Sequence, residues 1–367
     1  MDKTYTVIGL MSGTSLDGID ASIIRSDGEK LIEIKKNLYE PYDRNFKDSL
    51  NDYIKTINSI KNINNSHYKY RVLEQELTIK HSEISSKIIK ENDNEEINFV
   101  GFHGQTIIHK PEEGYSIQMG DAKLLSQLLK KKVFFNFRKN DIKNNGNGAP
   151  LAPIFHYNLS KFLKIPEPNI ILNIGGISNF TYINKNIVRA QDIGPGNVLM
   201  DEYLRKEKKL DYDKDGVLAE RGSVNYDIVN QFIEHVYYNS KNKHSFNRND
   251  FDYSFIRDLN FEDAIATLTY FTANIIAKYI NKNFEKNLSV IICGGGRKNK
   301  TLVNFIKKLS DKNIVLIDSY GVDGDFVESQ TFGYLAIRSF LKKNISFPET
   351  TKVNQPVTGG ELVVNFQ

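Results

Sequence analysis

The chain lacks the features that mark the commonest metal-binding and nucleotide-binding proteins. It has one cysteine, Cys293, which rules out an internal disulfide and a zinc site with several thiolate ligands. No apolar run approaches the roughly 20 residues of a membrane-spanning helix, and no H-x-H or H-E-x-x-H pattern gathers histidines for a metal. The motifs G-x-x-x-x-G-K-[ST], G-x-G-x-x-G and H-R-D are also missing, so P-loop, Rossmann and protein-kinase folds lose their main support.

An excess of charge of one sign is also missing. Lys and Arg number 49 against 45 Asp and Glu, a formal net charge of +4, and the basic residues are scattered along the chain. Residues 130–132, three lysines, are most simply a solvated helix end, where cations complement the helix dipole. The first residues pass straight into an apolar strand with no signal-peptide pattern. We therefore expect a cytoplasmic protein without nucleic-acid or membrane partners, in which Cys293 is buried.

The chain does contain glycine-rich turns at the ends of apolar strands. Residues 9–21, GLMSGTSLDGIDA, predict a β-hairpin whose tip offers backbone amides and hydroxyls to an anion. Residues 173–179, NIGGISN, form a second such tip between two apolar runs. Residues 291–298, IICGGGRK, place three glycines between a strand and a helix start, where free N–H groups favour an anion or a nucleoside. The first turn alone could be an ordinary polar hairpin, but the three together predict a nucleotide site.

The order of the predicted elements indicates two similar α/β halves, for which 367 residues are sufficient. Three strands follow closely within residues 5–38, which favours a mixed sheet over a doubly wound one. Helices and a strand at 98–102 come next, and a strand at 133–137 then begins a block that repeats the same order. A long helix at 262–279 is expected to cover the second sheet. We expect a first domain at 1–130, completed by a C-terminal helix at about 335–367, and a second domain at 131–334.

Nine motifs, in order along the chain, resemble those of a known family. They are GLMSGTSLDGIDA (9–21), GFHGQT (101–106), QMGD (118–121), NFRKND (136–141), GNGAPLAPIFH (146–156), LNIGGISN (172–179), DIGPGN (192–197), CGGGRKN (293–299) and GVDGDFVESQTFGYLA (321–336). With them the chain resembles the anhydro-N-acetylmuramic acid kinase family, a branch of the sugar kinase/Hsp70/actin superfamily, over essentially its whole length. HSFNRNDF (244–251) departs from a family pattern like KSTGREDF, and Asn147 replaces a customary Gln. By the resemblance, both departures concern the wall of the substrate site.

The resemblance implies both a fold and a reaction. The fold is a pair of actin/Hsp70/sugar-kinase-like (RNase H-like) domains with mixed five-stranded sheets flanking a nucleotide cleft. In the reaction, ATP, 1,6-anhydro-N-acetylmuramic acid and water give ADP and N-acetylmuramic acid 6-phosphate, for the recycling of peptidoglycan. The family also suggests a homodimer. Two alternatives stay open: an ordinary sugar or carboxylate kinase of the superfamily, and a non-enzymatic ATP-driven switch.

The resemblance also assigns catalytic roles. Asp192 is the candidate base, and a positioned carboxylate of this kind contributes about 10²–10⁴ in rate; from spacing alone it could instead cap the helix that begins near Asn197. Glu328 is the second catalytic candidate, and its alternative is a first-turn glutamate that stabilises the helix dipole. Mg²⁺ bridging the nucleotide phosphates is expected, with Asp17, Asp20 and Glu328 as candidate ligands.

The expected binding residues fall into a sugar set and a nucleotide set. Arg138 and Asp141 suit the lactyl carboxylate and the sugar hydroxyls, although an Arg–Asp surface pair is the simpler alternative. His103 and Gln105, at the end of a predicted strand, could hydrogen-bond the sugar, as could Asn197, although a lone histidine there is more often structural. The nucleotide set is Gly13, Thr14, Ser15, Leu16, Asp17, Gly18, Ile19, Asp20, Asn173, Gly175, Gly176, Gly294, Gly295 and Gly296.

Overall fold

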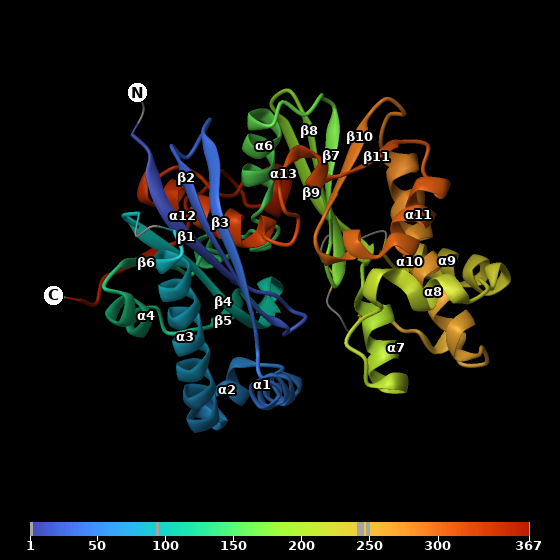
Figure 1. The fold of residues 1–367 in the computed structure, drawn as a ribbon, viewed down its shortest axis with the longest axis horizontal. Coiled ribbons are helices and arrows are strands. Elements are labelled where there is room, and N and C mark those ends of the chain that lie inside the picture. Colours follow the sequence, from blue (N-terminus) through green and yellow to red (C-terminus); the bar gives the residue numbers. More distant parts are fainter. Residues whose placement is uncertain (1–2, 93–94, 241–245, 247–249, 367) are drawn as a thin grey trace. The chain divides into compact units, whose positions relative to one another are not determined.

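The computed structural model describes residues 3–92, 95–240, 246 and 250–366, and the chain divides into two units (Figure 1). Unit 1 is Met1–Lys164 together with Phe326–Gln367, and unit 2 is Ile165–Asp325. None of the helices in the described ranges is both long and apolar enough to cross a membrane.

Unit 1 is built on a mixed sheet with the strand order β12-β6-β4-β1-β2-β3, in which β5 pairs with β4. Strands β1, β4 and β6 are parallel, and β2 is antiparallel to both β1 and β3. The strands are β1 (Tyr5–Ser12), β2 (Gly18–Ser26), β3 (Ile32–Pro41), β4 (Phe99–Lys110), β5 (Tyr115–Met119), β6 (Lys132–Phe135) and β12 (Glu361–Val363). The helices are α1 (Arg44–Thr56), α2 (Ile60–Asn65), α3 (His67–Lys90), the 3₁₀ turn η1 (Pro111–Glu113), α4 (Ala122–Leu129), α5 (Lys139–Lys143), α6 (Pro153–Phe162), α12 (Val327–Phe340) and α13 (Pro348–Thr351).

Helices cover both faces of the unit 1 sheet because side chains alternate along its strands. Ile8 of β1 packs into a core with Leu77 of α3, whereas the next residue, Gly9, faces α12. A Cβ at Gly9 would lie 1.9 Å from the carbonyl oxygen of Ser329, and one at Gly101 of β4 would be 2.2 Å from the backbone of the same helix. Helix α12 therefore lies directly on the backbone of β1 and β4, and this contact fixes its first turn relative to those strands.

Unit 2 contains a five-stranded sheet with the order β11-β10-β7-β8-β9. Its strands are β7 (Asn169–Ile174), β8 (Ile177–Asn184), β9 (Ile187–Pro195), β10 (Ser289–Cys293) and β11 (Asn313–Leu316). Its helices are α7 (Val198–Lys208), α8 (Val217–Arg221), α9 (Tyr226–Ser240), α10 (Phe261–Asn283), α11 (Lys300–Leu309) and the 3₁₀ turns η2 (Lys214–Gly216), η4 (Ser254–Ile256), η5 (Gly295–Lys298) and η6 (Ile317–Tyr320). Ile265 and Ile275 of α10 share a core with Ile170 of β7, so α10 covers this sheet as predicted.

Both sheets have the same order of strands. Counted along the chain within each unit, and leaving out β5 and β12, the order is third, second, first, fourth, fifth, with the second strand antiparallel to its neighbours. This repeat confirms the predicted fold class of two similar α/β domains with mixed sheets. The unit 1 sheet departs from the expected five strands because β5 and β12 extend it to seven.

The structure places the division between the units later than the sequence suggested. The strand expected at 133–137 to open the second domain is β6, which pairs in parallel with β4 and so completes the first sheet. The chain returns to unit 1 at Phe326, before the expected residue 335, because the whole of α12 packs on β1, β2 and β4. The partners of a strand or helix are a non-local property, which local sequence patterns do not contain.

Candidate active-site residues in each unit

Two of the predicted glycine-rich turns lie side by side at one edge of the unit 2 sheet. Strands β7 and β10 are parallel neighbours, and Asn173 pairs with Cys293, which is fully buried as expected. Gly294 has φ +80°, and a Cβ there would lie 2.3 Å from Oδ1 of Asn173, so the turn requires glycine at this position. At Gly295 a Cβ would meet nothing within 4 Å, so the packing of the protein does not explain this glycine. An open backbone is what a closely approaching ligand needs.

The 192–197 turn is bound to the same edge by backbone hydrogen bonds. Gly196 N donates to Gly176 O at 2.9 Å, and Asn197 N donates to Gly175 O at 2.8 Å. A Cβ at Gly196 would lie 2.2 Å from Gly175 O, which explains the glycine in this turn. The carboxamide of Asn197 makes no hydrogen bond with any other described residue and so remains available to a ligand.

Asp192 lies within β9 and does not cap a helix. Helix α7 begins at Val198, and its N-cap residue is Asn197. The pairing of β8 with β9 shifts register next to Asp192, and such a bulge redirects the side chains beside it. The half-buried carboxylate accepts a hydrogen bond from Phe246 N at 2.9 Å. Burial raises the pKa of Asp192 to about 7, although the Phe246 amide opposes this shift.

Arg297 lies within the CGGGRKN motif, but nothing in the motif indicated a role for its side chain. Its guanidinium is almost fully buried and donates to Asp318 at 2.8 and 3.0 Å, to Asp323 at 2.7 Å, and to Asp325. It also donates to Gly294 O at 3.2 Å. Burial lowers the pKa of Arg297, but the hydrogen bonds with Asp318 and Asp325 outweigh burial and raise it overall. Arg297 thus joins the Gly294–Gly296 turn to the loop that follows β11.

The predicted phosphate hairpin of unit 1 has the expected form. Strands β1 and β2 are antiparallel, and between them Leu16 N donates to Gly13 O at 3.2 Å. The side chains of Thr14 and Ser15 are exposed at the tip, whereas Leu16 is buried with φ +60°. Ile19, inside β2, is also buried, so only the backbone of Leu16 and Ile19 could contact a phosphate.

The two predicted metal candidates of this hairpin, and the glycine between them, have different surroundings. The carboxylate of Asp17 lies 3.2 Å from Nζ of Lys47. Gly18 packs on β3, where a Cβ would lie 2.3 Å from a backbone oxygen. Asp20 is half-buried in β2 and pairs with Met11 across the sheet. Within the described ranges, no three His, Cys, Asp or Glu side chains gather as a metal site.

Arg138, just after β6, holds two neighbours with its guanidinium. Nε and Nη2 donate to Nε2 of His103 at 3.2 and 2.9 Å, and Nη1 donates to Gly148 O at 2.8 Å. Burial lowers the pKa of Arg138 to about 10, although the carboxylates of Glu328 and Asp141 oppose this shift. The group stays charged at neutral pH. The alternative of an Arg–Asp surface pair does not apply, because Asp141 is buried and no direct ion pair joins it to Arg138 in the described structure.

Asp141 is engaged by its own loop. Its carboxylate accepts hydrogen bonds from Gly148 N at 2.6 Å and from the hydroxyl of Thr351. Gly148 is therefore held at its N–H by Asp141 and at its C=O by Arg138. A Cβ at Gly146 would lie 2.1 Å from Oδ1 of Asp141, so this glycine makes room for the carboxylate.

His103 and Gln105 lie in the middle of a strand and not at its end, because β4 continues to Lys110. Both side chains are buried. Both ring nitrogens of His103 are engaged within unit 1, at Gly104 O and at Arg138, whereas Oε1 of Gln105 has no hydrogen-bond partner among the described residues. A buried acceptor without a partner is costly, and a ligand donor could satisfy it.

Glu328 lies in the first turn of α12, as predicted. Its side chain is accessible to solvent, yet the protein around it displaces water and raises the pKa of the carboxyl, while Arg138 opposes the shift. Unit 1 therefore brings Glu328, Arg138 and His103 into one electrostatically coupled group.

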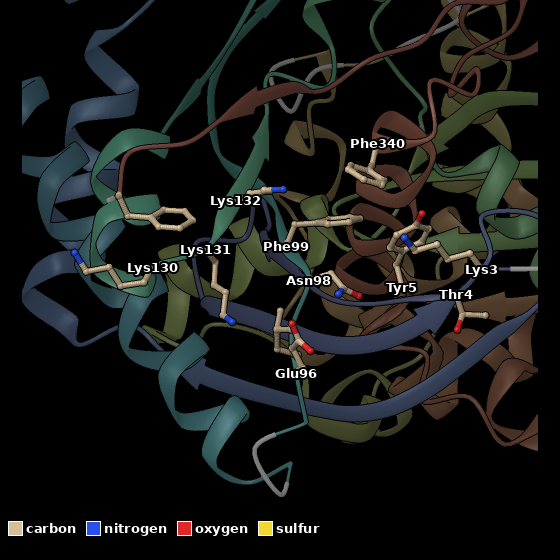
Figure 2. Close-up of a pocket in the computed structure, with 12 residues that line it drawn as sticks. Lys3, Thr4, Tyr5, Glu96, Asn98, Phe99, Lys130, Lys131, Lys132 and Phe340 are labelled. Carbon is tan, nitrogen blue, oxygen red and sulfur yellow. The ribbon is translucent and has the colours of Figure 1, made fainter.

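The hollow drawn in Figure 2 lies at the starting ends of strands in the unit 1 sheet, away from the hairpin tip that follows the end of β1. It has a volume of about 400 Å³ and lies where β1, β4 and β6 begin, beside Phe340 at the end of α12. None of the predicted site residues lines it. Lys130 is exposed and ends α4 with φ +53°, as expected of a solvated helix end. Lys132 is also exposed, but it already belongs to β6, so the expectation holds for the first of the three lysines only.

Comparison with known proteins decides the family. Residues 5–364 match the family described as anhydro-N-acetylmuramic acid kinase. The chain belongs to this family. The anhydro-N-acetylmuramic acid kinase of Pelagibacter ubique is 49% identical over 376 residues and covers 100% of both chains. The enzyme of the same name from Zymomonas mobilis is 36% identical over 97% of this chain and 98% of its own. Among solved structures, the activator of 2-hydroxyisocaproyl-CoA dehydratase from Clostridium difficile with bound ADPNP covers 93% of this chain and 99% of its own, at 15% identity and a TM-score of 0.45.

The family assignment confirms the resemblance found in the nine motifs, and the two departures can be placed in part. Asn147 N donates to Thr351 O at 2.7 Å, so this residue anchors its loop through the backbone. Residues 244, 245 and 247–249 lie outside the described part of the chain. Phe246, within the same departure, is the donor to Asp192, a contact that no motif indicated.

Proposed function

We propose that this member of the anhydro-N-acetylmuramic acid kinase family opens 1,6-anhydro-N-acetylmuramic acid with water and transfers the γ-phosphoryl group of ATP to O6. The observation that carries the proposal is the carboxyl of Asp192, whose pKa of about 7 suits a general base at neutral pH. The family match over residues 5–364 supports the choice of substrate.

The nucleotide is assigned to the glycine-rich turns. Gly294–Gly296 and Asn173–Gly176 adjoin at one sheet edge, and the open backbone at Gly295 permits close approach. In unit 1 the exposed hydroxyls of Thr14 and Ser15 can donate to phosphate oxygens. Mg²⁺ would come with the phosphates, near Asp17, Asp20 or Glu328, and would neutralise charge that develops during transfer.

The sugar is assigned to the group around Arg138. Three of its five N–H donors are used inside the protein, and the remaining two, one on each Nη, match the two oxygens of a carboxylate such as the lactyl group. Within unit 1, Oε1 of Gln105 lacks a partner among the described residues and is a candidate for a sugar hydroxyl. In unit 2, the carboxamide of Asn197 does not cap α7, and its role toward the sugar stays a prediction from the family.

The proposed reaction balances without a further reactant. Asp192 takes a proton from water as its oxygen bonds to C1 of the sugar. The bond from C1 to O6 breaks, O6 bonds to the γ-phosphorus, and ADP leaves. The proton on Asp192 passes to solvent. Because its pKa is near 7, the carboxylate is both basic enough to accept the proton and able to release it.

An isotope experiment tests the proposal. Turnover of 1,6-anhydro-N-acetylmuramic acid with ATP in H₂¹⁸O should place the label on C1 and none in the phosphate ester. The product is read by mass spectrometry at early times against unlabelled product in the same water, because the anomeric oxygen itself exchanges slowly.

The two alternatives predict different products. An ordinary sugar kinase would phosphorylate a free 6-hydroxyl and incorporate no solvent oxygen during transfer. A nucleotide switch would release ADP at a rate that the anhydro-sugar does not change. Either result would overturn the proposal. The homodimer suggested by the family and the cytoplasmic location expected from the sequence stay predictions, and sedimentation equilibrium tests the first.

A further inference from the structure

His103 is held by the structure in one protonation state. It is 2% exposed, and its ring lies against that of Phe332 in α12, with the centroids 4.3 Å apart. Nδ1 is 2.8 Å from Gly104 O, and the following glycine has φ +73°. Because a carbonyl only accepts hydrogen bonds, Nδ1 carries the proton, and Nε2 is left as an acceptor.

The contacts of Arg138 lead to the same assignment independently. A guanidinium has five N–H donors and no acceptor, so Nε2 of His103 must offer a lone pair to receive Nε and Nη2. Burial and the charge of Arg138 hold the pKa of His103 well below its ordinary value, so the ring remains neutral. The third contact, from Nη1 to Gly148 O, fixes the other side of the guanidinium plane.

Two N–H groups of Arg138 then remain, one on Nη1 and one on Nη2. Their direction is set by His103 and Gly148, because a planar group held at two sides cannot turn. Glu328 acts on Arg138 through its charge, and no hydrogen bond joins the two in the described structure. The remaining pair of donors is therefore directed by the protein and not occupied by it.

We propose that His103 is a positioning residue for substrate selection: its neutral ring holds Arg138 so that the two unused N–H groups bind a carboxylate on the sugar. This inference rests on the proposed function, in which Arg138 meets the substrate. His103 itself does not touch the sugar, because both of its nitrogens are used within unit 1. It acts on the preference for an acidic sugar over its neutral counterpart.

The test compares two sugars that differ in the lactyl group. Dissociation constants for 1,6-anhydro-N-acetylmuramic acid and 1,6-anhydro-N-acetylglucosamine are measured by calorimetry on the full chain. In His103→Leu the preference for the acidic sugar should fall about tenfold, because a charged hydrogen-bond pair is worth roughly 1.5–3 kcal/mol when well aligned. Affinity for the neutral sugar should change little. His103→Gln, whose Oε1 can accept from Arg138, should recover most of the preference.

Two controls separate positioning from packing. Phe46 of α1, also 2% exposed in unit 1, is replaced by Leu as a buried ring that packs against Tyr42, and should leave the preference unchanged. In an Arg138→Lys background, His103→Leu should have no further effect on the preference, because the group that it positions is gone.

The outcomes are distinct. Equal losses for both sugars in His103→Leu, or an equally large loss of preference in Phe46→Leu, would mean that His103 only fills space, and would overturn the inference. If His103→Leu does not fold, His103→Gln is compared with His103→Asn, whose side chain is shorter and whose oxygen reaches less far toward Arg138. Equal preference for the acidic sugar in these two variants would then overturn the inference. A wild-type protein that binds neither sugar would refute the proposed function, whatever the variants do.

Discussion

The two units share a strand order and use it in different ways. In unit 2 the candidate residues are mainly backbone: three glycine-rich turns adjoin at a sheet edge, and one carboxylate, Asp192, lies beside them. In unit 1 they are mainly charged side chains, with Arg138, Glu328 and Asp141 near His103. A common sheet thus fixes where loops meet, and the loops decide whether a unit suits a polyphosphate or a charged organic substrate.

The carboxyl groups of the two units illustrate the difference. The pKa of Asp192 is raised by burial, with no charged neighbour among the causes of the shift. Loss of solvent also raises the pKa of Glu328, but the Arg138 guanidinium opposes this rise. A buried carboxyl without a counter-charge is suited to accept a proton, whereas one next to a guanidinium is suited to hold charge in place.

Replacement of Asp192 tests this division most directly. Asp192→Asn keeps the shape but removes the base, so turnover should fall about 10²-fold or more while nucleotide affinity and the melting temperature stay near those of wild type. Steady-state kinetics and calorimetry measure these quantities. Asp258→Asn, an exposed aspartate of the same unit, is the matched control. Near-normal turnover in Asp192→Asn would remove this residue from the chemistry.

Arg297 tests whether the unit 2 turns depend on a buried charge. Arg297→Met leaves the carboxylates of Asp318, Asp323 and Asp325 without their shared partner, and we expect the free energy of unfolding to fall by about 3 kcal/mol. Affinity for an ATP analogue should fall with it, because the Gly294 carbonyl loses its donor. Urea unfolding and calorimetry provide the two measurements.

The neighbouring lysine is the control for that experiment. Lys298 also pairs with Asp325, but its side chain is 59% exposed, so Lys298→Met should cost less than about 1 kcal/mol. Equal destabilisation by the two variants would show that the buried guanidinium has no special role in the turn.

The turns could be predicted from the sequence because their causes are local. Glycines between apolar runs specify a hairpin tip wherever the strands pair, and both 9–21 and 173–179 form such tips in the structure. The repeat of strand, turn, strand and helix likewise gave the fold class. The charged residue behind the third turn could not be found in this way, since Arg297 meets aspartates more than 20 residues further along the chain.

The burial of side chains was harder to foresee for the same reason. His103 was expected at a strand end, but β5 extends the pairing of β4 beyond it and the residue is enclosed. Nothing local to Asp318, Asp323 and Asp325 says that all three pair with one buried arginine. The bulge that redirects Asp192 depends on the pairing of β8 with β9, which is again non-local.

The pH dependence of turnover sharpens the contrast between the two carboxyl groups. With a pKa of about 7, Asp192 is protonated and inactive as a base below that pH, so kcat should fall about tenfold for each pH unit below about 6.5 and level off above about 7.5. The residual activity of Asp192→Asn should lack this limb, whereas Asp258→Asn should keep it. A flat profile in wild type between pH 5 and 7 would contradict the assignment.

The smallest expected effect concerns the hairpin tip of unit 1. Ser15 is exposed and its hydroxyl has no hydrogen-bond partner among the described residues, so its replacement by Ala should leave stability unchanged. One hydrogen bond to a phosphate oxygen is worth about 1 kcal/mol, which predicts a rise of about fivefold in KM for ATP. If this bond is equally strong in ground and transition states, kcat stays constant. Ser223→Ala, an exposed serine of unit 2, controls for the loss of a surface hydroxyl. An unchanged KM in Ser15→Ala would show that this tip, unlike the glycine turns of unit 2, contributes only its backbone to the nucleotide.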